Sequence, residues 1–401
     1  MKIVIVMDKF KESLSAKEAA LVISSGLKSN GKEVDICCIP LADGGDGTID
    51  ALESIERSGK IMVKAVDPLG RDICVPVLLT GKRAICEMAQ STGLTLLTKK
   101  ERNPLYTSSY GLGMVIKAIA GMGVEEVVVG IGGSATNDCG AGMLQALGYR
   151  FLGDNGTIIG KNPLCAKAIG PGVTKGVVEE RGTYREWAEI IKGKDLIEIG
   201  GIDDSLVEES VRRLKITVAS DVTNPLTGVY GAVRVYGPQK GATQAIVEEL
   251  ERGVESFSKV ATKSLGRDYS AITGAGAAGG VGFAFAAFLR AEVRPGWKIL
   301  FEMLDVEKEI SRADLIITGE GRVDGQSLSG KLLDGVCTIC TKYGKRLWVI
   351  CGDNLLTEKE LERAGVERLF SISQIEPVKE RAIKNARQYL YEIAGRAPIT
   401  I

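Results

Sequence analysis

Histidine is absent from the 401-residue chain. Its absence excludes Ser-His-Asp and Cys-His catalysis, histidine-ligated zinc sites and any imidazole base. If the protein moves a proton, the group that carries it must be an Asp, Glu, Lys, Tyr or Cys side chain.

The chain also lacks an excess of either charge, because 51 Lys and Arg residues balance 51 Asp and Glu residues. Nucleic-acid-binding proteins normally carry a basic surplus that neutralises phosphates, so no nucleic-acid partner is expected. Residues 271–289 form an uncharged stretch long enough to test as a membrane span. Its first half is rich in glycine, which predicts a turn leading into a buried helix over 281–289 and no membrane partner.

The N-terminus has little of the apolar character of a secretory signal, since only one lysine and five apolar residues precede Asp8 after the initiating Met. The nine cysteines are odd in number and scattered. Both features favour a cytoplasmic protein with free thiols. Cys337 and Cys340 form a single CxxC pair, which we expect to pack inside a helix rather than bind zinc.

What is present is an ordinary globular composition, with 45% apolar and 25% charged residues. The length favours two domains. Apolar runs predict strands over 3–6 and 34–41, and amphipathic segments predict helices over 15–28 and 49–56, the first capped by Ser13 or Ser15. Alternation of strand and helix is typical of a parallel sheet.

The pattern then changes, because three short strands over 60–66, 73–79 and 83–88 follow one another without room for helices and should pair antiparallel. Further on, helices are expected over 110–121 and 142–147, strands over 126–131 and 215–220, and a surface excursion near 172–200. The alternating pattern returns at the C-terminus, with strands over 315–318, 347–351 and 369–372 and helices over 305–312, 332–343 and 379–394.

These elements predict an α/β fold. A doubly wound, Rossmann-like parallel sheet domain would comprise residues 1–58 and 281–401, and a second α/β domain of mixed sheet would be inserted over 59–280.

Glycine is abundant, with 50 residues. Four glycine-rich loops lie at or near expected strand ends: ADGGDGT (42–48), GIGGSATND (130–138), GAGAAGGVG (274–282) and TGEGRVDGQS (318–327). Ligands of open α/β sheets bind at the carboxyl ends of strands, where helix N-termini offer free N–H groups to anions. Four such loops, three of which carry a carboxylate, predict a site for a polyanion and a metal ion.

The known nucleotide-binding fingerprints fit poorly. The G-x-G-x-x-G spacing of Gly274, Gly276 and Gly279 lacks a preceding strand, which argues against a dinucleotide site. Residues 325–331 have the spacing of a Walker A loop, but Leu332 stands where a Ser or Thr would hold Mg²⁺.

Six carboxylates lie at expected strand ends: Asp8, Asp43, Asp46, Asp221, Glu320 and Asp324. A single Asp at such a position is more often a helix cap or a turn residue. For the six together, we expect at least two to bind Mg²⁺ or to act as a base. Lys11 and Arg322 are the nearby cations, and the alternative for them is a solvated ion pair.

Stretches in the same order along nearly the whole chain resemble the bacterial glycerate kinase family. They include FKESLSAKEAA (10–20), PLADGGDGT (40–48), EMAQSTGL (87–94), RNPLYTSSYGLG (102–113), GIGGSATNDCGAGMLQALG (130–148), SDVTNPLTGVYGA (220–232), YGPQKGA (236–242), GAGAAGGVGFA (274–284) and DLIITGEGRVDGQSLSGK (314–331). The resemblance implies ATP-dependent phosphorylation of D-glycerate with Mg²⁺, by an enzyme of two α/β domains with its active site in the cleft between them.

Taken with the loops, the resemblance leads to a set of expected site residues. The catalytic candidates are Asp324, Asp43, Asp8, Arg322 and Lys11. The ATP-binding candidates are Gly44, Gly45, Gly47, Thr48, Gly132, Gly133, Ser134, Thr136, Asn137, Gly276, Gly279, Gly319 and Glu320. The metal-binding candidates are Asp46 and Asp221.

The sequence departs from the family pattern at Lys9 and Glu12, which replace the usual Ser and Gly of the first motif. Asp46 stands where Glu is common, and Leu333 where Pro is usual. Two alternatives therefore stay open, a kinase for another small hydroxy or sugar acid and a non-catalytic sensor. The product is expected to be 2-phosphoglycerate, with 3-phosphoglycerate as the alternative, and the protein a monomer or homodimer.

Overall fold

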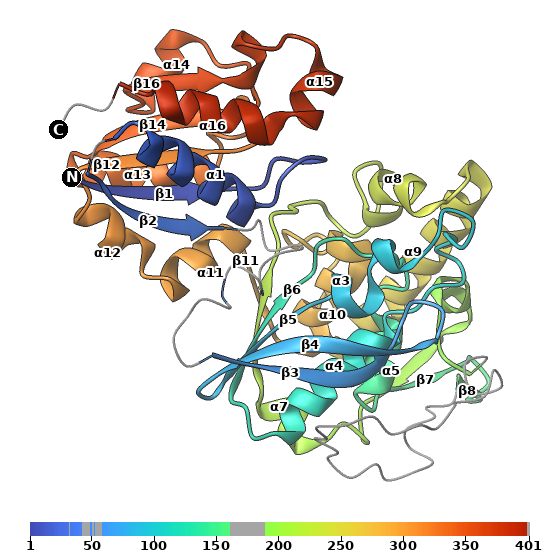
Figure 1. The fold of residues 1–401 in the computed structure, drawn as a ribbon. Coiled ribbons are helices and arrows are strands. Elements are labelled where there is room, and N and C mark those ends of the chain that lie inside the picture. The colour runs from blue at the N-terminus through green and yellow to red at the C-terminus, as the bar shows by residue number, and fades with distance from the viewer. Residues whose placement is uncertain (32, 42–48, 50–51, 53–57, 161–188, 399–401) are drawn as a thin grey trace. The chain divides into compact units, whose positions relative to one another are not determined.

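The structure, a computed structural model, describes residues 1–31, 33–41, 49, 52, 58–160 and 189–398 (Figure 1). The chain divides into two compact units. Unit 1 comprises Met1–Asp43, Asp50–Ile55 and Pro295–Ile401, and unit 2 comprises Gly44–Ile49 and Glu56–Arg294. Each unit has a sheet and a hydrophobic core of its own.

Unit 1 is built on a five-stranded sheet in which all neighbours are parallel, in the order β16-β14-β12-β1-β2. Its strands are β1 (Lys2–Met7), β2 (Asp35–Pro40), β12 (Leu315–Gly319), β14 (Arg346–Cys351) and β16 (Arg368–Ser371). Chain order therefore runs outward from β1 in one direction to β2 and in the other to β12, β14 and β16. This confirms the expected doubly wound sheet, and its topological switch point lies between β1 and β12.

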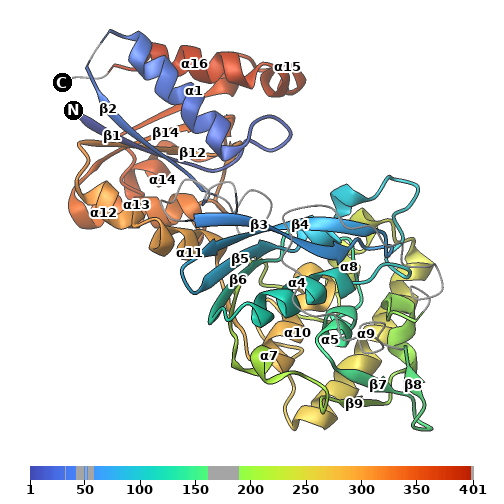
Figure 2. The same ribbon diagram turned by 60° about the horizontal axis from the view of Figure 1, so that its bottom comes forward.

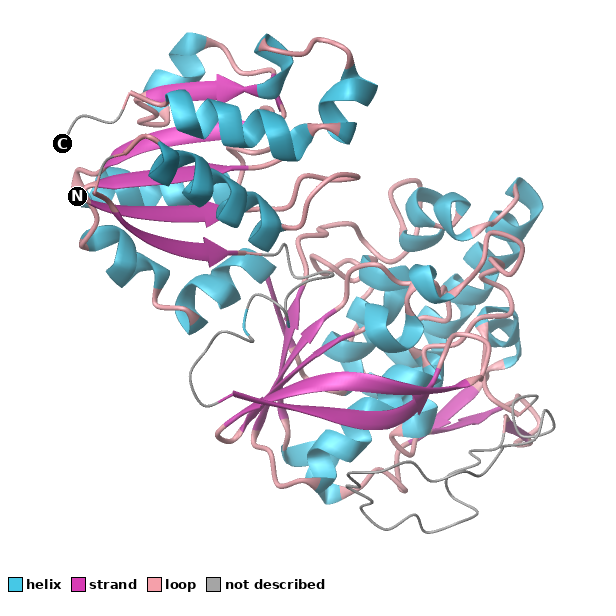
Figure 3. Cartoon of the chain, in the orientation of Figure 1, coloured by secondary structure: helices cyan, strands magenta, loops and turns pink. Residues whose placement is uncertain are grey.

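Helices cover both faces of this sheet (Figures 2 and 3). They are α1 (Ala16–Ser29), α11 (Gly296–Met303), α12 (Val306–Ser311), α13 (Leu332–Tyr343), α14 (Glu358–Arg363), α15 (Lys379–Lys384) and α16 (Ala386–Arg396). In Figure 2, α1 and α16 lie on one face, and α12 and α13 lie on the other. The strands are buried on both faces, which is why they read as continuous apolar runs in the sequence.

Local signals account for the ends of several helices. Helix α1 begins with a capping box, in which Ser15 accepts from the Glu18 N–H and the Glu18 side chain accepts from the Ser15 N–H. Ser15 is therefore the cap, of the two serines proposed. In α13, Cys337 and Cys340 are buried with free thiols, as expected.

Unit 2 contains a six-stranded mixed sheet in the order β11-β10-β6-β5-β4-β3. Its strands are β3 (Ser58–Val66), β4 (Asp72–Thr80), β5 (Arg83–Glu87), β6 (Glu126–Gly130), β10 (Lys215–Ala219) and β11 (Glu292–Arg294). The pairs β3–β4 and β4–β5 are antiparallel, as predicted, and the remaining pairs are parallel. A small sheet joins β7 (Arg150–Leu152) to β8 (Ile158–Ile159) and β9 (Gly201–Asp203).

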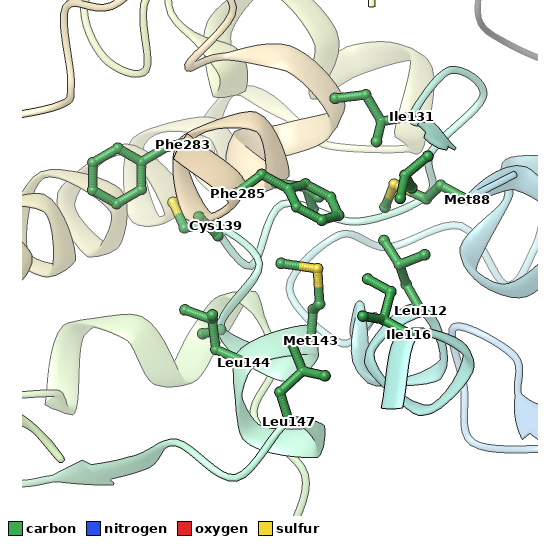
Figure 4. Packing of buried hydrophobic residues seen from close by; sticks show 14 of the residues in the cluster. Met88, Leu112, Ile116, Ile131, Cys139, Met143, Leu144, Leu147, Phe283 and Phe285 are labelled. Carbon is green, nitrogen blue, oxygen red and sulfur yellow. The ribbon is translucent and has the colours of Figure 1, made fainter. Parts of the chain in front are cut away.

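The helices of unit 2 are α3 (Ala89–Thr92), α4 (Tyr110–Gly121), α5 (Ala141–Ala146), α7 (Glu209–Arg213), α8 (Ala232–Tyr236), α9 (Gln244–Leu265) and α10 (Val281–Phe288). Figure 4 shows side chains of α4, α5 and α10 meeting in the core, with Leu112, Met143 and Phe285 turned toward one another. The turn that precedes α10 and the helix itself were both expected from the sequence.

The return from unit 2 to unit 1 differs from the expected position near residue 281. Helix α10 packs in the core of unit 2, and β11 pairs with β10, so both elements belong to unit 2 and the chain returns between Arg294 and Pro295. The helix expected over 49–56 lies outside the described residues except for Ile49 and Leu52, and so does the excursion up to residue 188.

No helix in the described part of the chain has both the length and the apolar character required to cross a membrane.

Candidate functional site

The carboxyl ends of β1 and β12 meet at the switch point of unit 1, where ligands of open α/β sheets usually bind. Asp8 follows β1, and its N–H donates to the carbonyl of Gly319, the last residue of β12, at 2.9 Å. Glu320 comes next in the chain. Asp8, Gly319 and Glu320, all predicted from the sequence, are thus brought together.

Glu320 is the carboxylate of this group with a shifted pKa. Burial raises it, and the neighbouring Asp324 raises it further, whereas a hydrogen bond from Ser327 and the charges of Lys331 and Lys11 lower it. A carboxylate that is partly shielded from water and whose pKa is raised is suited to accept a proton.

Asp324 serves a turn as well as this cluster. Its Oδ1 accepts from the Gln326 N–H at 2.9 Å, and its own N–H donates to Ser327 Oγ at 3.2 Å. Asp324 is therefore a turn residue, which was the alternative considered for a single Asp at a strand end. This role leaves the carboxylate close enough to Glu320 to affect its pKa.

The two predicted cations of unit 1 are both exposed. Arg322 begins the short strand β13 (Arg322–Val323), and its Nε lies 3.8 Å from Oδ2 of Asp353 in β15 (Asp353–Asn354). Lys11 lies in a turn closed by the Phe10 N–H, which donates to the Leu14 carbonyl at 2.8 Å. Both side chains are therefore accessible to an anion in solvent.

In unit 2, four parallel strands end level with one another. Glu87 of β5 pairs with Gly130 of β6, Gly130 pairs with Ala219 of β10, and Ala219 pairs with Arg294 of β11. The loop after β6 and the carboxylate of Asp221, two residues after β10, therefore leave the sheet at the same edge. This juxtaposition was predicted from their positions at strand ends.

The backbone of the loop after β6 is anchored at several points. The Gly133 carbonyl accepts from the Leu94 N–H at 2.8 Å, and the Ala135 N–H donates to the Thr92 carbonyl at 2.9 Å. The Ala135 carbonyl also accepts from Thr107 Oγ1 at 3.0 Å. Gly132 and Gly133 form the turn at its start, and Gly133 has a φ of 71°, which glycine adopts without strain. Ser134 is buried and bridges to Gly93.

Two side chains of this anchored loop have polar atoms without partners. Thr136 Oγ1, Asn137 Nδ2 and Asn137 Oδ1 are buried and make no hydrogen bond to any described residue. A buried polar group without a partner costs about 1–3 kcal/mol, so such groups are rare and call for an explanation. Three of them on adjacent residues, in a loop predicted to bind phosphates, are suited to a polar ligand.

Asp138, the last residue of the loop motif, is fully buried and has a structural role. Its carboxylate accepts from the N–H and Oγ of Ser109, both at 2.7 Å, and from the N–H groups of Gly140 and Gly142 at 3.2 Å. Burial raises the pKa of Asp138, and these donors oppose the shift. The carboxylate ties the start of α5 to the start of α4.

Three glycines predicted to contact ATP are required by packing. A Cβ would lie 1.7 Å from the Ile350 carbonyl oxygen at Gly319, 2.2 Å from that of Pro225 at Gly276, and 1.9 Å from that of Thr136 at Gly279. Backbone passes too close for any side chain. The contact of Gly279 with Thr136 also places the 274–282 loop against the loop after β6.

Six predicted residues lie outside the described residues: Asp43, Gly44, Gly45, Asp46, Gly47 and Thr48. Among the residues that are described, no three Asp, Glu or Cys side chains are grouped as a ready-made metal site. Mg²⁺ usually takes one or two carboxylates and completes its shell with water and substrate phosphates. Each described candidate, Glu320 after β12 in unit 1 and Asp221 after β10 in unit 2, is a carboxylate of the type that such a metal takes as a ligand.

Sequence reasoning missed three buried charged residues near the loop after β6. Glu87 accepts from the Ile49 N–H at 2.8 Å, Asp138 is described above, and Lys240 donates from Nζ to the Thr136 carbonyl at 2.7 Å. Each lies in a stretch that carries the family resemblance. The sequence signal that could have indicated their burial is the presence of a charged residue within an otherwise apolar or glycine-rich motif.

Comparisons with known proteins show the family to which the chain is related. The sequence model of the glycerate kinase family matches residues 3–169 and 182–399. A glycerate kinase of Bacillus subtilis (strain 168) is 38% identical over 397 residues, which cover 98% of this chain and 96% of that protein. A glycerate 2-kinase of Escherichia coli (strain K12) is 37% identical over 374 residues, which cover 93% of this chain and 90% of that protein.

A crystal structure assigned as glycerate kinase 2 from Salmonella typhimurium LT2 is similar to this fold, with a TM-score of 0.76 and 36% sequence identity. The match covers 98% of this chain and 97% of that one. On the family match and on these full-length relatives, the chain belongs to the glycerate kinase family.

Proposed function

We propose that this protein is an enzyme that transfers the γ-phosphoryl group of ATP to D-glycerate, and that the product is 2-phosphoglycerate. The observation that carries the proposal is the similarity to glycerate kinases over nearly the whole chain. The 2-phosphoglycerate assignment follows the name of the Escherichia coli relative, a glycerate 2-kinase.

We assign a separate role to each of the two groups of residues. Phosphoryl transfer depends on positioning and on stabilisation of negative charge rather than on an elaborate set of catalytic groups. The anchored loop of unit 2, with the unpartnered polar atoms of Thr136 and Asn137, would bind phosphate oxygens. Arg322 and Lys11, both exposed in unit 1, would hold the carboxylate of glycerate or the transferring group.

A carboxylate would prepare the attacking hydroxyl. Asp324 is our choice for the base, and Glu320, whose pKa is raised by burial and by the charge of Asp324, is the second candidate. Asp46 and Asp221 would hold Mg²⁺, which when bound supplies neutralising charge to the phosphate oxygens. The free thiols of the described cysteines agree with a cytoplasmic location.

A panel of hydroxy acids tests the proposal. The purified protein is incubated with MgATP and either D-glycerate, tartronate or a longer sugar acid, and ADP release is followed with a coupled assay. D-glycerate should give the highest kcat/KM, and excess EDTA should abolish turnover. Phosphorus NMR of the product against authentic 2- and 3-phosphoglycerate decides which hydroxyl is phosphorylated.

Each competing function has its own outcome in this experiment. A higher kcat/KM for another acid would identify a kinase with that substrate. Binding of D-glycerate by calorimetry, with no ADP release at any MgATP concentration, would identify a sensor.

A further inference from the structure

Lys240 is a charged residue in the interior of unit 2 that the proposed chemistry leaves unused. It lies in the η4 turn (Pro238–Lys240) that follows α8, and 2% of its surface is exposed. Lysine is almost never buried to this extent without a partner. Its Nζ donates to the Thr136 carbonyl at 2.7 Å.

The turn that carries Lys240 is itself fixed in place. Gly241 has a φ of 94°, and a Cβ there would lie 2.2 Å from the Arg102 carbonyl oxygen, so the backbone is packed against residue 102. The Lys240 N–H donates to the Gly237 carbonyl at 3.0 Å. The lysine therefore reaches the loop from a rigid base.

The carbonyl that Lys240 holds belongs to the residue with an unpartnered hydroxyl, and the next residue, Asn137, has an unpartnered amide. On its other side the Thr136 carbonyl abuts Gly279, whose missing side chain leaves room for it. The direction of the peptide between Thr136 and Asn137, and with it the direction of both side chains, is thus fixed by Lys240 and Gly279.

We propose that Lys240 is a positioning residue, whose bond to the Thr136 carbonyl keeps the side chains of Thr136 and Asn137 directed at a bound ligand. The ligand is the phosphate chain of ATP, so this inference rests on the proposed function. Lys240 itself does not touch the ligand.

The charged groups around Lys240 define how pH acts on it. Burial lowers the pKa of Lys240 to about 7, and the charge of Asp138 partly opposes this. Arg102 contacts Gly241 through its backbone, and Arg234 of α8 has its Nε 3.8 Å from Oε1 of Glu251 in α9. Because a charged donor makes the stronger hydrogen bond, the hold on the loop weakens as Lys240 loses its proton above neutral pH.

The test compares two variants at residue 240. Lys240→Met removes the donor, whereas Lys240→Gln keeps a neutral donor on a side chain that is one bond shorter. We expect Lys240→Met to raise KM for MgATP at least about tenfold with a smaller change in kcat, and Lys240→Gln to restore most of the loss. As the pH is raised from 6 to 8, Lys240 of the wild type loses its proton and the KM of the wild type for MgATP should rise. The Gln side chain does not titrate, so the ratio of KM in Lys240→Gln to KM in the wild type should fall.

Lys192 provides a matched control. It is also buried, and its Nζ donates to a backbone carbonyl outside the loop, that of Ile190, at 3.1 Å. Burial lowers its pKa as well. Lys192→Met should therefore show the change in stability that follows from removing a buried lysine. The ratio of its KM for MgATP to that of the wild type should not change with pH.

The proposal is overturned if folded Lys240→Met keeps KM for both substrates within twofold of the wild type, or if Lys240→Gln is as impaired as Lys240→Met. An increase in KM for D-glycerate alone would overturn the assignment of ATP as the ligand of this loop. It would show that Lys240 positions side chains that bind D-glycerate. If the wild type does not phosphorylate D-glycerate, the proposed function fails. The dissociation constants of the wild type and Lys240→Met for ATP, measured by calorimetry, are then compared instead of KM. Equal constants for wild type and Lys240→Met, or no ATP binding by either, then overturn the positioning role.

Discussion

At the scale of the residue, Glu12 has an unfavourable backbone conformation. Its φ is 64°, in the turn between β1 and α1, and it is exposed. Residues other than glycine lose about 1–2 kcal/mol in this left-handed region. Glycine is usual at this place in the family motif because it adopts this conformation without that penalty.

Glu12→Gly should stabilise unit 1 by up to about 1 kcal/mol, because relief of the backbone strain outweighs the greater freedom of glycine in the unfolded chain. Denaturant unfolding measures the change. Gly31→Ala is the matched control, since Gly31 has a φ of 67° and open space around it. It should destabilise the same unit by about 1 kcal/mol. A neutral or destabilising Glu12→Gly would show that Glu12 makes a compensating contact.

Asp324 tests the chemistry at the same scale. Asp324→Asn keeps the Oδ1 that accepts from the Gln326 N–H and removes the charge, so we expect near-normal stability and a loss of about 10²–10⁴ in kcat. Asp268→Asn is the control, because Asp268 accepts from the Ser270 N–H at 2.8 Å in an equivalent turn. It should leave kcat unchanged. If Asp324→Asn keeps more than half of the activity, Asp324 is a turn residue only.

The sequence was informative about carboxylates at strand ends and less so about buried charges. Asp8 and Glu320 follow apolar runs directly, so their place at the sheet edge could be predicted. Lys240 and Glu87 look like surface residues in the sequence, because their burial depends on partners distant in the chain. Lys240 meets Thr136, more than one hundred positions away.

At the scale of the element, the strands of the unit 1 sheet and the long helices α1, α4 and α13 were predicted closely, whereas two other long helical segments were not. Each strand of the unit 1 sheet begins and ends within one residue of its expected position, because a buried parallel strand is an apolar run between turn residues. One helix expected over 379–394 is divided at Asn385 into α15 and α16. Helix α9, the longest in the described part, was not predicted, although Thr243 caps it and an apolar residue recurs on one face.

Phe257 shows how α9 is held in unit 2. Its ring is fully buried, with centroids 5.9 Å from Phe151 and 6.3 Å from both Phe283 and Phe288. Phe257→Ala should cost about 3–5 kcal/mol in the unfolding free energy of unit 2, since it removes a large apolar surface and leaves a cavity.

The control for Phe257→Ala lies on the opposite face of the same helix. Glu255 is exposed, so Glu255→Ala should change the unfolding free energy by less than about 0.5 kcal/mol. Equal effects of the two variants, measured by denaturant unfolding, would mean that α9 contributes little to the core.

At the scale of the whole molecule, Lys240 links stability to pH. Its pKa is about 7 in the folded protein, below the ordinary value of 10.5. Below pH 7 the side chain is charged in both states. Between about pH 7 and 10.5 the unfolded chain binds one more proton than the folded one, so this residue makes stability rise with pH.

The difference in unfolding free energy between wild type and Lys240→Met should therefore shift in favour of the wild type as the pH rises above 7. The limiting slope is about 1.4 kcal/mol per pH unit, which corresponds to one proton. Denaturant midpoints at pH 6, 8 and 9 measure it, and the variant serves as the reference for all other titrating groups. A difference that is constant with pH would show that Lys240 keeps its proton when buried.

The two hydrophobic cores predict two unfolding events. All members of one core lie between Val63 and Ala291 in unit 2, and all members of the other lie in unit 1. Buried apolar surface is the main source of cooperativity within a unit. The cores can be probed separately with the same small change, because Ile23 in α1 and Ile116 in α4 are both fully buried.

Ile23→Val should lower the midpoint of one calorimetric transition and Ile116→Val that of the other, each by roughly 2–4 °C for a loss of about 1 kcal/mol. Each variant removes one methylene from a buried helical position, so differences between them reflect the unit and not the substitution. A double variant should show both shifts, since distant sites add. The contrary outcome is a single calorimetric transition whose midpoint is lowered by either variant. The two units would then unfold together, and the peptide segments that connect them, rather than the separate cores, would determine the cooperativity of unfolding.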